Sequence, residues 1–295
     1  MFLIAWLLFY YQVKRGEGKM IRKVLAACLA LMVCVTMTAC GGSDSSSEEK
    51  TTLVVGMECN YAPFNWTVTE ESDTTMPIEN ASGYADGYDV QIAKMIAEEL
   101  GMDLQIKKIA WDGLQPALES GEIDMIIAGM TADEEREQGA DFTTPYYESE
   151  MVMIVRADDA LANATTLEDF SGKNVVGQIS TTYDEVIDQI PGVNHVTPLK
   201  SYPEMINALQ QNVVDGITAE LPVATGAVEA NPDLAIVHFD EGHGFEADTS
   251  VSIALPEGSR DGDLFKKIQE ALDNIDDQTR QDLMLEVTQR QPASV

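Results

Sequence analysis

Residues 117–128 read Ala-Leu-Glu-Ser-Gly-Glu-Ile-Asp-Met-Ile-Ile-Ala, and 91 residues later 208–219 read Ala-Leu-Gln-Gln-Asn-Val-Val-Asp-Gly-Ile-Thr-Ala. Each copy predicts a helix, a turn and a strand. Gly121 matches Asn212, and these two residue types best tolerate a left-handed helix end. Convergence on a common structural unit is one explanation of the repeat. Two similar α/β lobes explain it more economically, and they place a ligand cleft between them at the carboxyl ends of the strands.

The segments around this repeat alternate between strand-like and helix-like patterns. Leu53–Met57 and Leu104–Ile109 predict strands, and Met125–Met130 is a continuous apolar run typical of a buried parallel strand. Between the first two strands, Asp89 is expected to cap a helix that ends at Gly101. This alternation predicts the α/β class.

The chain carries a large excess of acidic residues. Of 295 residues, 18 are Lys or Arg and 50 are Asp or Glu, which gives a formal net charge of −32. Such a charge opposes binding to nucleic acid or to an anionic membrane face. A hydrophobic content of 45% still allows a large core, so disorder driven by charge is not expected. The length suggests roughly two domains.

The amino terminus predicts export and a lipid anchor. Residues 20–39 have the design of a signal peptide, with two basic residues, an apolar stretch too short for a comfortable membrane span, and small residues at the end. The segment 37–41, Met-Thr-Ala-Cys-Gly, resembles the lipobox of bacterial lipoproteins. Cys40 is therefore expected to carry a lipid and to begin the mature chain. A plain signal peptide with an incidental cysteine is the alternative.

Two further segments flank this signal. Residues 1–19 duplicate a hydrophobic start that Met20 already supplies, and we interpret them as a mis-called start of translation. Residues 40–50 are small and polar, which predicts a flexible tether between the lipid and the folded domain.

The remaining cysteine and histidine residues indicate neither a metal site nor a nucleophile. Cys59 is the one cysteine that follows the tether, and a lone cysteine is more often a packing residue than a reactive thiol. His238 and His243 lie five residues apart, which is not the spacing of two ligands on one helix face. We interpret them as part of a solvated acidic turn, and we expect no cofactor.

Two helix starts follow predicted strands and suit a bound carboxylate. Residues 131–134, Thr-Ala-Asp-Glu, form a capping box with Arg136 beside it, and Ser180-Thr181-Thr182 begins a second helix. Backbone N–H groups at a helix start, together with an arginine, can hold a carboxylate. Plain helix capping is the alternative, so the ligand interpretation concerns Thr131, Arg136 and Thr181.

Five motifs in order over most of the chain carry a resemblance to a known family. They are Gly56–Trp66, Gly87–Val90, Gly121–Asp124, Gly129–Arg136 and Phe142–Tyr146. With these motifs, residues 52–289 resemble the type 2 periplasmic-binding fold, in the polar amino-acid family of ABC-transporter solute-binding proteins.

The resemblance implies an α/β protein of two lobes with the ligand cleft between them. Lobe 1 would comprise 51–150 and 252–295, and lobe 2 would comprise 151–251. Two crossing segments, near Met151–Ile154 and Ser250–Ile253, would join the lobes and act as a hinge.

By resemblance, the ligand is an α-amino acid held at both of its ends. Arg136 and Thr131 would hold the α-carboxylate, assisted by Thr181 across the cleft. Glu220 would hold the α-ammonium, and backbone acceptors near Gly129 would help.

The same resemblance assigns the side-chain end of the ligand. Tyr61 and Trp111 would flank the ligand side chain with π faces that favour cationic or planar groups. Glu58 matches an acidic position that binders of basic amino acids use for the distal cation, which suits arginine, lysine or histidine. Ala128 and Gly129 stand where such binders often carry a serine pair. Glutamine or another neutral polar amino acid is therefore the alternative ligand.

The implied function is capture and delivery rather than catalysis. The expected partners are an ABC permease and its ATPase. The protein is expected to be a monomer on the outer face of the cytoplasmic membrane, with its lipid as the only membrane contact. Two other hypotheses remain: an enzyme similar to cyclohexadienyl dehydratase, with Glu220 as its acid, and a ligand sensor for a signalling partner.

Overall fold

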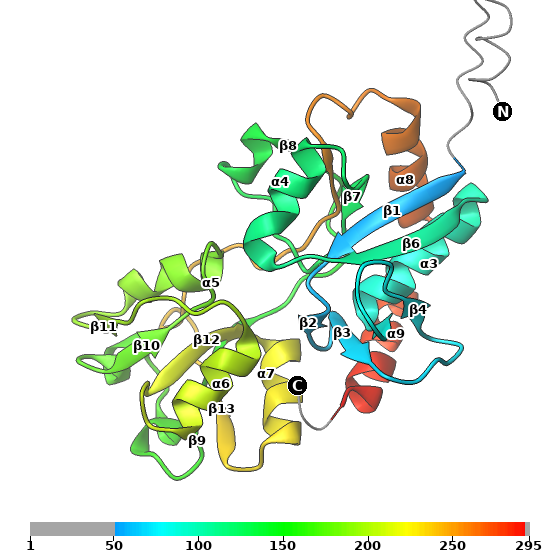
Figure 1. Ribbon diagram of the computed structural model, residues 1–295. Coiled ribbons are helices and arrows are strands. Elements are labelled where there is room, and N and C mark those ends of the chain that lie inside the picture. The colour runs from blue at the N-terminus through cyan, green and yellow to red at the C-terminus, as the bar shows by residue number, and fades with distance from the viewer. Residues whose placement is uncertain (1–50, 293–295) are drawn as a thin grey trace, which may run out of the picture. The chain divides into compact units, whose positions relative to one another are not determined.

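The computed structural model describes residues 51–292, which form two lobes, each built around its own five-stranded sheet (Figure 1). The segments interpreted as a mis-called start (1–19), a signal peptide (20–39) and a tether (40–50) lie outside the described residues, and so does Cys40. None of the helices within 51–292 combines the length and the apolar character that a membrane span requires.

Lobe 1 contains a mixed sheet with the strand order β6-β1-β7-β14-β8. β1 runs parallel to β6 and β7, whereas β14 is antiparallel to both of its neighbours. Leu53, Val55 and Met57 of β1 are fully buried, as expected for a strand in the middle of a covered sheet. The strands are β1 (Thr52–Met57), β6 (Asp103–Lys108), β7 (Met125–Ile126), β8 (Ala140–Phe142) and β14 (Ala254–Pro256).

Lobe 2 repeats this arrangement with the strand order β11-β10-β12-β9-β13. β10 runs parallel to β11 and β12, and β9 is antiparallel to β12 and β13. The strands are β9 (Met151–Arg156), β10 (Asn174–Val176), β11 (Asn194–His195), β12 (Gly216–Glu220) and β13 (Leu234–Val237). Each sheet therefore has one antiparallel strand in the fourth position.

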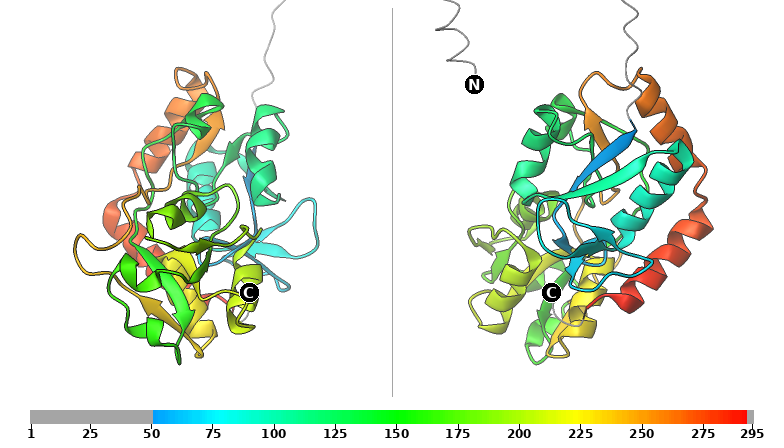
Figure 2. Two further views of the ribbon diagram at one scale, coloured as in Figure 1. Left: turned by 90° about the vertical axis from the view of Figure 1, so that its left-hand side faces the viewer. Right: turned by 45° about the vertical axis from the view of Figure 1, so that its right-hand side comes forward.

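Helices and a small third sheet complete the two lobes. α3 packs against α8 in lobe 1, and α9 runs past α3 to reach α7 of lobe 2 (Figure 2). The third sheet joins β2 (Asn60–Tyr61), β3 (Asn65–Val68), β5 (Tyr84–Asp86) and β4 (Met76–Pro77). The α-helices are α3 (Tyr88–Leu100), α4 (Leu114–Glu119), α5 (Thr182–Glu185), α6 (Tyr202–Gln210), α7 (Leu221–Ala230), α8 (Asp263–Asp273) and α9 (Asp277–Arg290). The 3-10 turns are η1 (Trp111–Gly113), η2 (Arg136–Gln138), η3 (Ala160–Asn163), η4 (Leu167–Phe170) and η5 (Val186–Gln189).

The two copies of the sequence repeat form the same unit in the two lobes. The first copy is α4 followed by β7, and the second is α6 followed by β12. Gly121 and Asn212 both adopt the left-handed conformation, with φ of 75° and 59°. Asp124 accepts a hydrogen bond from the backbone of β1 at 2.8 Å, and Asp215 accepts one from the backbone of β10 at 3.0 Å. Each aspartate thus joins the turn before its strand to the neighbouring strand.

The helix cap predicted at Asp89 is wrong. α3 has Gly87 at its N-cap position with φ of 128°, where a Cβ would lie 2.2 Å from the carbonyl oxygen of Phe64. The Asp89 side chain makes no cap because its carboxylate accepts hydrogen bonds from Asn65 and Tyr146 instead.

Two chain segments cross between the lobes and pair with each other. The N–H of Tyr146 donates to the carbonyl of Val251 at 2.8 Å, and the N–H of Val251 donates to the carbonyl of Tyr147 at 2.9 Å. The first crossing therefore precedes β9, and its predicted position at Met151–Ile154 is wrong because those residues lie in the sheet of lobe 2. The second crossing includes the predicted Ser250–Ile253.

A bidentate ion pair fastens the end of α9 to lobe 1. Arg290 Nε lies 3.2 Å from Asp86 Oδ2, and Arg290 Nη2 lies 3.0 Å from Asp86 Oδ1. Asp86 also accepts from the hydroxyl of Thr74 and the N–H of Gly87. Because the carboxylate is buried, loss of the guanidinium would leave a negative charge with fewer partners.

We predict that Arg290→Met lowers the free energy of unfolding by about 2 kcal/mol, between the values for exposed and for fully buried ion pairs. Urea denaturation measures this loss. Arg260→Met is the matched control, because Arg260 is exposed and makes a single side-chain bond to Asp141. The control should cost less than about 1 kcal/mol. Equal losses in the two variants would show that the α9 pair has no special role.

Candidate functional site

Side chains from both lobes meet where the carboxyl ends of their parallel strands converge. The cavity that they leave is about 10 Å³, close to the smallest volume that can hold a single water molecule. Its lining residues are Tyr61, Trp111, Gly129, Thr131 and Arg136 from lobe 1, and Gln178, Thr181, Thr182 and Tyr183 from lobe 2. Glu58 and Glu220 adjoin it through hydrogen bonds to Gln178 and Tyr61. The structure thus brings together all the residues that the sequence predicted for the site.

Arg136 is the positive centre of the site. Its Nη1 donates to the carbonyl of Thr131 at 2.8 Å and lies 3.1 Å from Asp133 Oδ2. Its Cζ lies 5.3 Å from the ring centroid of Trp111, which is a cation–π distance. Burial lowers the pKa of Arg136, and Asp133 acts in the opposite direction. An arginine stays charged under these conditions and suits a carboxylate partner.

The helix predicted to begin at the capping box 131–134 is wrong. Asp133 Oδ1 accepts from the N–H of Arg136 at 2.8 Å, and this bond leads only into η2, a 3-10 turn of three residues. Within the described part of lobe 1, no α-helix starts beside Arg136, so its guanidinium is not assisted by a helix dipole in attracting an anion. In lobe 2, Thr181 is the N-cap residue of α5, and its hydroxyl donates to the carbonyl of Gln178 at 2.7 Å.

The carbonyl of Ser180 connects the lobes. It accepts from Trp111 Nε1 at 3.0 Å and from Arg136 Nη2 at 2.9 Å, and both donors belong to lobe 1. Ser180 itself is in the left-handed region with φ of 60°. The closed arrangement of the lobes is thus held by a backbone oxygen that two side chains share.

Glu220 is a fully buried acid at the end of β12 and the start of α7. Its Oε1 accepts from the hydroxyl of Tyr61. Its Oε2 has no hydrogen-bond partner among the described residues. Burial raises the pKa of Glu220 to about 8, although the Tyr61 bond acts to lower it. An unpartnered oxygen on a buried acid can be stabilised by a cationic donor.

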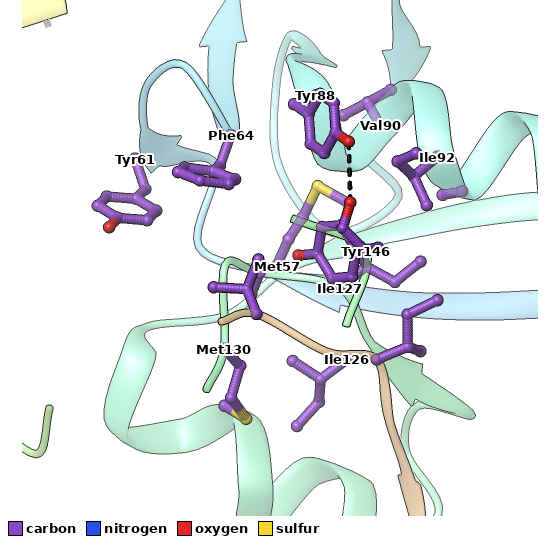
Figure 3. Close-up of a cluster of buried hydrophobic side chains, with 14 of the residues drawn as sticks. Met57, Tyr61, Phe64, Tyr88, Val90, Ile92, Ile126, Ile127, Met130 and Tyr146 are labelled. Carbon is purple, nitrogen blue, oxygen red and sulfur yellow. Dashed lines mark hydrogen bonds between the residues drawn. The ribbon is translucent and has the colours of Figure 1, made fainter. Parts of the chain in front are cut away.

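Tyr61 and Gly129 fit against each other. The Tyr61 ring stacks on Phe64 at 5.4 Å and lies 5.3 Å from Tyr202 (Figure 3 shows Tyr61 beside Phe64). A Cβ on Gly129 would lie 2.9 Å from Tyr61 Cε1, and Gly129 has φ of 62°. A serine at this position would therefore push the Tyr61 ring aside. The strand predicted over Met125–Met130 is shorter than expected, because the chain leaves β7 after two residues to make this turn.

Glu58 is buried on the lobe 1 side and meets Gln178 of lobe 2. Gln178 Nε2 donates to Glu58 Oε2 at 3.1 Å and to the carbonyl of Lys200 at 3.0 Å. Burial raises the pKa of Glu58 to about 7. The Gln178 bond and Lys108 act to lower this pKa, whereas the nearby acids Asp112 and Glu204 act to raise it.

Sequence reasoning missed several residues of the site. Gln178, Thr182 and Tyr183 line the cavity, and Ser180 holds the two lobe 1 donors. A polar residue just past the carboxyl end of a predicted parallel strand was a usable signal for Gln178. Ser180 gave no such signal, because its contribution is a carbonyl oxygen in an unusual backbone conformation.

The Cys59 thiol and the His238 ring are not among the groups that line the cavity. Cys59 is buried, and burial raises the pKa of its thiol to about 12, which disfavours the thiolate. His238 Nδ1 lies 3.3 Å from Glu150 Oε1 on the surface. Over 51–292, no three His, Cys, Asp or Glu side chains are grouped as metal ligands.

The comparison with known proteins agrees with this two-lobed site. Residues 53–286 match the model of the bacterial extracellular solute-binding proteins, family 3. The chain belongs to this family. It is 32% identical to a "Probable histidine-binding protein" of Campylobacter jejuni, over 76% of this chain and 84% of that protein. It is 29% identical to the "L-cystine-binding protein TcyJ" of Escherichia coli K12, over 84% of this chain and 86% of that protein.

Solved structures give the same result. "An ancestral arginine-binding protein bound to glutamine" superposes with a TM-score of 0.67 and 30% identity, over 80% of this chain and 97% of that chain. The fold is thus the two-lobed periplasmic-binding fold that the sequence predicted. The relatives are solute-binding proteins rather than enzymes, and their family is extracellular.

We predict that Trp111→Phe favours separation of the lobes, because it removes the donor to Ser180 while keeping an aromatic ring. The open population should rise about fivefold to tenfold, the value of one hydrogen bond. Energy transfer between dyes on exposed Glu119 and Val213 would measure it. Trp66→Phe is the matched control, because the buried Trp66 Nε1 has no hydrogen-bond partner within residues 51–292. An unchanged open population in Trp111→Phe would contradict the role of this bond.

Proposed function

We propose that this solute-binding protein captures a cationic amino acid, arginine, lysine or histidine, and delivers it to an ABC permease. The strongest support is the buried carboxylate of Glu58, to which Gln178 gives a single neutral donor. A buried acid with nearby negative charge favours a cationic partner over a neutral one.

The two ends of an amino acid also find complementary groups. The guanidinium of Arg136 suits the α-carboxylate, with Thr131 and Thr181 lining the same cavity. Glu220 Oε2 suits the α-ammonium, because it is buried and has no partner among the described residues. Tyr61 would then share Glu220 with the ligand.

Binding is expected to follow a cycle of opening and closure. A cavity of about 10 Å³ cannot admit an amino acid, so the lobes must separate first. The paired crossing segments at Tyr147 and Val251 are the natural hinge. Closure restores the bonds from Trp111 and Arg136 to Ser180, and the closed protein is the form expected to dock on the permease.

The anchor and the partners belong to the same proposal. A lipid on Cys40, with 40–50 as the tether, would hold the protein as a monomer on the outer face of the cytoplasmic membrane. An ATPase on the other side of the membrane would drive transport through the permease. The sequence of 20–41 supports this part of the proposal.

A neutral polar ligand such as glutamine is the second candidate. Ala128 and Gly129 offer no side-chain hydroxyl to a distal cation, and a protonated Glu58 can donate to an amide oxygen. The two candidates differ in the charge state that they require of Glu58.

Calorimetry of the wild-type protein with the twenty amino acids tests the proposal, and binding of none of them would refute it. We predict that Glu58→Gln weakens arginine binding about 30-fold or more, because it removes one partner of a buried charge pair. Glutamine binding should change much less. Glu204→Gln is the matched control, since Glu204 is an exposed acid near Glu58, and it should change arginine binding less than about threefold. Equal losses for arginine and glutamine in Glu58→Gln would favour the neutral ligand.

We predict that arginine affinity rises with pH between about 6 and about 8. Glu220 and Glu58 have raised pKa values of about 8 and about 7, and a cation requires their charged forms. Binding below these pH values must therefore release protons, and it becomes tighter as the acids ionise. The change is at most about tenfold per pH unit for each proton released. Calorimetry in two buffers of different ionisation enthalpy counts these protons, and a flat or falling affinity would contradict the assignment.

A further inference from the structure

Two loops form the lobe 1 wall of the site, and each turns on a residue in the left-handed region. The first loop contains Cys59, with φ of 52°, between Glu58 and Tyr61. The second contains Gly129, with φ of 62°, two residues before Thr131. The conformation of these two residues decides where the binding side chains point.

One buried side chain accepts a hydrogen bond from the backbone N–H of each turn. The N–H of Cys59 donates to Asn65 Oδ1 at 2.6 Å. The N–H of Gly129 donates to the hydroxyl oxygen of Tyr146 at 3.0 Å. Asn65 and Tyr146 are both fully buried, so water cannot replace either bond.

Both side chains then donate to the same carboxylate. Asn65 Nδ2 lies 2.7 Å from Asp89 Oδ2, and the hydroxyl of Tyr146 lies 2.7 Å from Asp89 Oδ1. Asp89 is fully buried in the first turn of α3, where its own N–H donates to the carbonyl of Phe64 at 2.8 Å. The two loops are therefore joined to one helix start through a single acid.

The polarity of this network depends on the carboxylate. An ionised carboxylate only accepts, so Asn65 and Tyr146 must both point a hydrogen at Asp89. Each then presents an acceptor oxygen to the loop that it holds. No neutral side chain of the same size provides two acceptors, because an amide replaces one of them with a donor.

Packing keeps the network in place. The hydroxyl of Tyr88 donates to the carbonyl of Tyr146 at 3.1 Å, and the two rings lie 6.0 Å apart (Figure 3). Phe64 meets the edge of Tyr88 at 6.1 Å. The aromatic rings exclude water and leave Asn65 and Tyr146 little freedom to turn away.

We propose that Asp89 is a positioning residue that sets both loops of the lobe 1 wall, the Glu58 loop through Asn65 and the Gly129 loop through Tyr146. This inference rests on the proposed function for its effect on binding, but not for its effect on the loops. The two arms predict different consequences. Loss of the Asn65 arm displaces Glu58 and reduces selectivity, whereas loss of the Tyr146 arm displaces the Gly129 loop and weakens every α-amino acid alike.

Amide hydrogen exchange of the full protein tests the loop positions without any ligand. In Asp89→Asn, the protection of the Cys59 or the Gly129 amide should fall about tenfold or more relative to wild type, because the amide keeps a single acceptor oxygen and one arm loses the acceptor that orients it. Tyr147→Phe is the matched control, since its ring packs on Phe64 and Tyr88 while no hydrogen bond within residues 51–292 joins its hydroxyl to the network, and it should leave both amides protected. Unchanged protection of both amides in Asp89→Asn would overturn the inference.

Calorimetry with arginine and glutamine tests the two arms separately. Asn65→Ala should reduce the preference between these ligands about tenfold, and Tyr146→Phe should weaken both by a similar factor without changing the preference. A purely structural role would lower the melting temperature of both variants with no such difference, and that result would overturn the inference. If wild type binds neither ligand nor any other amino acid, the proposed function fails, and the exchange experiment still decides the role of Asp89.

Discussion

Each five-stranded sheet receives its one antiparallel strand directly after the chain has crossed from the other lobe. β9 follows the first crossing into lobe 2, and β14 follows the second crossing back into lobe 1. The lobe 2 sheet needs the first crossing, and the lobe 1 sheet is not complete until both crossings are made. The two crossings pair with each other between Tyr147 and Val251. This connection keeps the parallel strand ends of the two lobes facing each other, and the site residues follow from it, because they stand at those ends.

The buried acids divide into two kinds according to their partners. Burial raises the pKa of Asp89 to about 7, yet both of its oxygens accept hydrogen bonds from neutral donors. Glu220 keeps one oxygen without a partner among the described residues, and Glu58 has one amide donor. The first kind organises the wall of the site, and the second kind leaves a need for positive charge that a ligand can meet. The formal net charge of −32 does not by itself select a solute.

Local patterns allowed the fold to be predicted, and long-range contacts limited the prediction of the site. The repeat around Asp124 and Asp215 predicted two equivalent units, because the residue types at helix ends and the apolar runs of buried strands can be recognised in a sequence. Local sequence around Asp89 predicted a helix cap. The side chain does not cap the helix because it bonds to Tyr146, which is 57 residues away and leaves no local signal. The helix predicted from the capping box at 131–134 is absent for a local reason. Asp133 accepts from the N–H of Arg136, and the turn that follows has only three residues. The site residues came from motif positions, and Ser180 was missed because a backbone carbonyl has no sequence signature.

The pairing of the two crossings has a consequence for how such proteins can be recombined. Since Tyr147 and Val251 are neighbours in space, everything between them is inserted at one place on lobe 1. That insert carries Gln178, Ser180 and Glu220, whereas lobe 1 keeps the other residues of the candidate site. An exchange of the segment between two family members would therefore move one wall of the site as a unit, with two covalent joints. Because buried residues of the two lobes belong to one continuous cluster, with Tyr61 against Tyr202, the exchanged segment must also match lobe 1 at that contact.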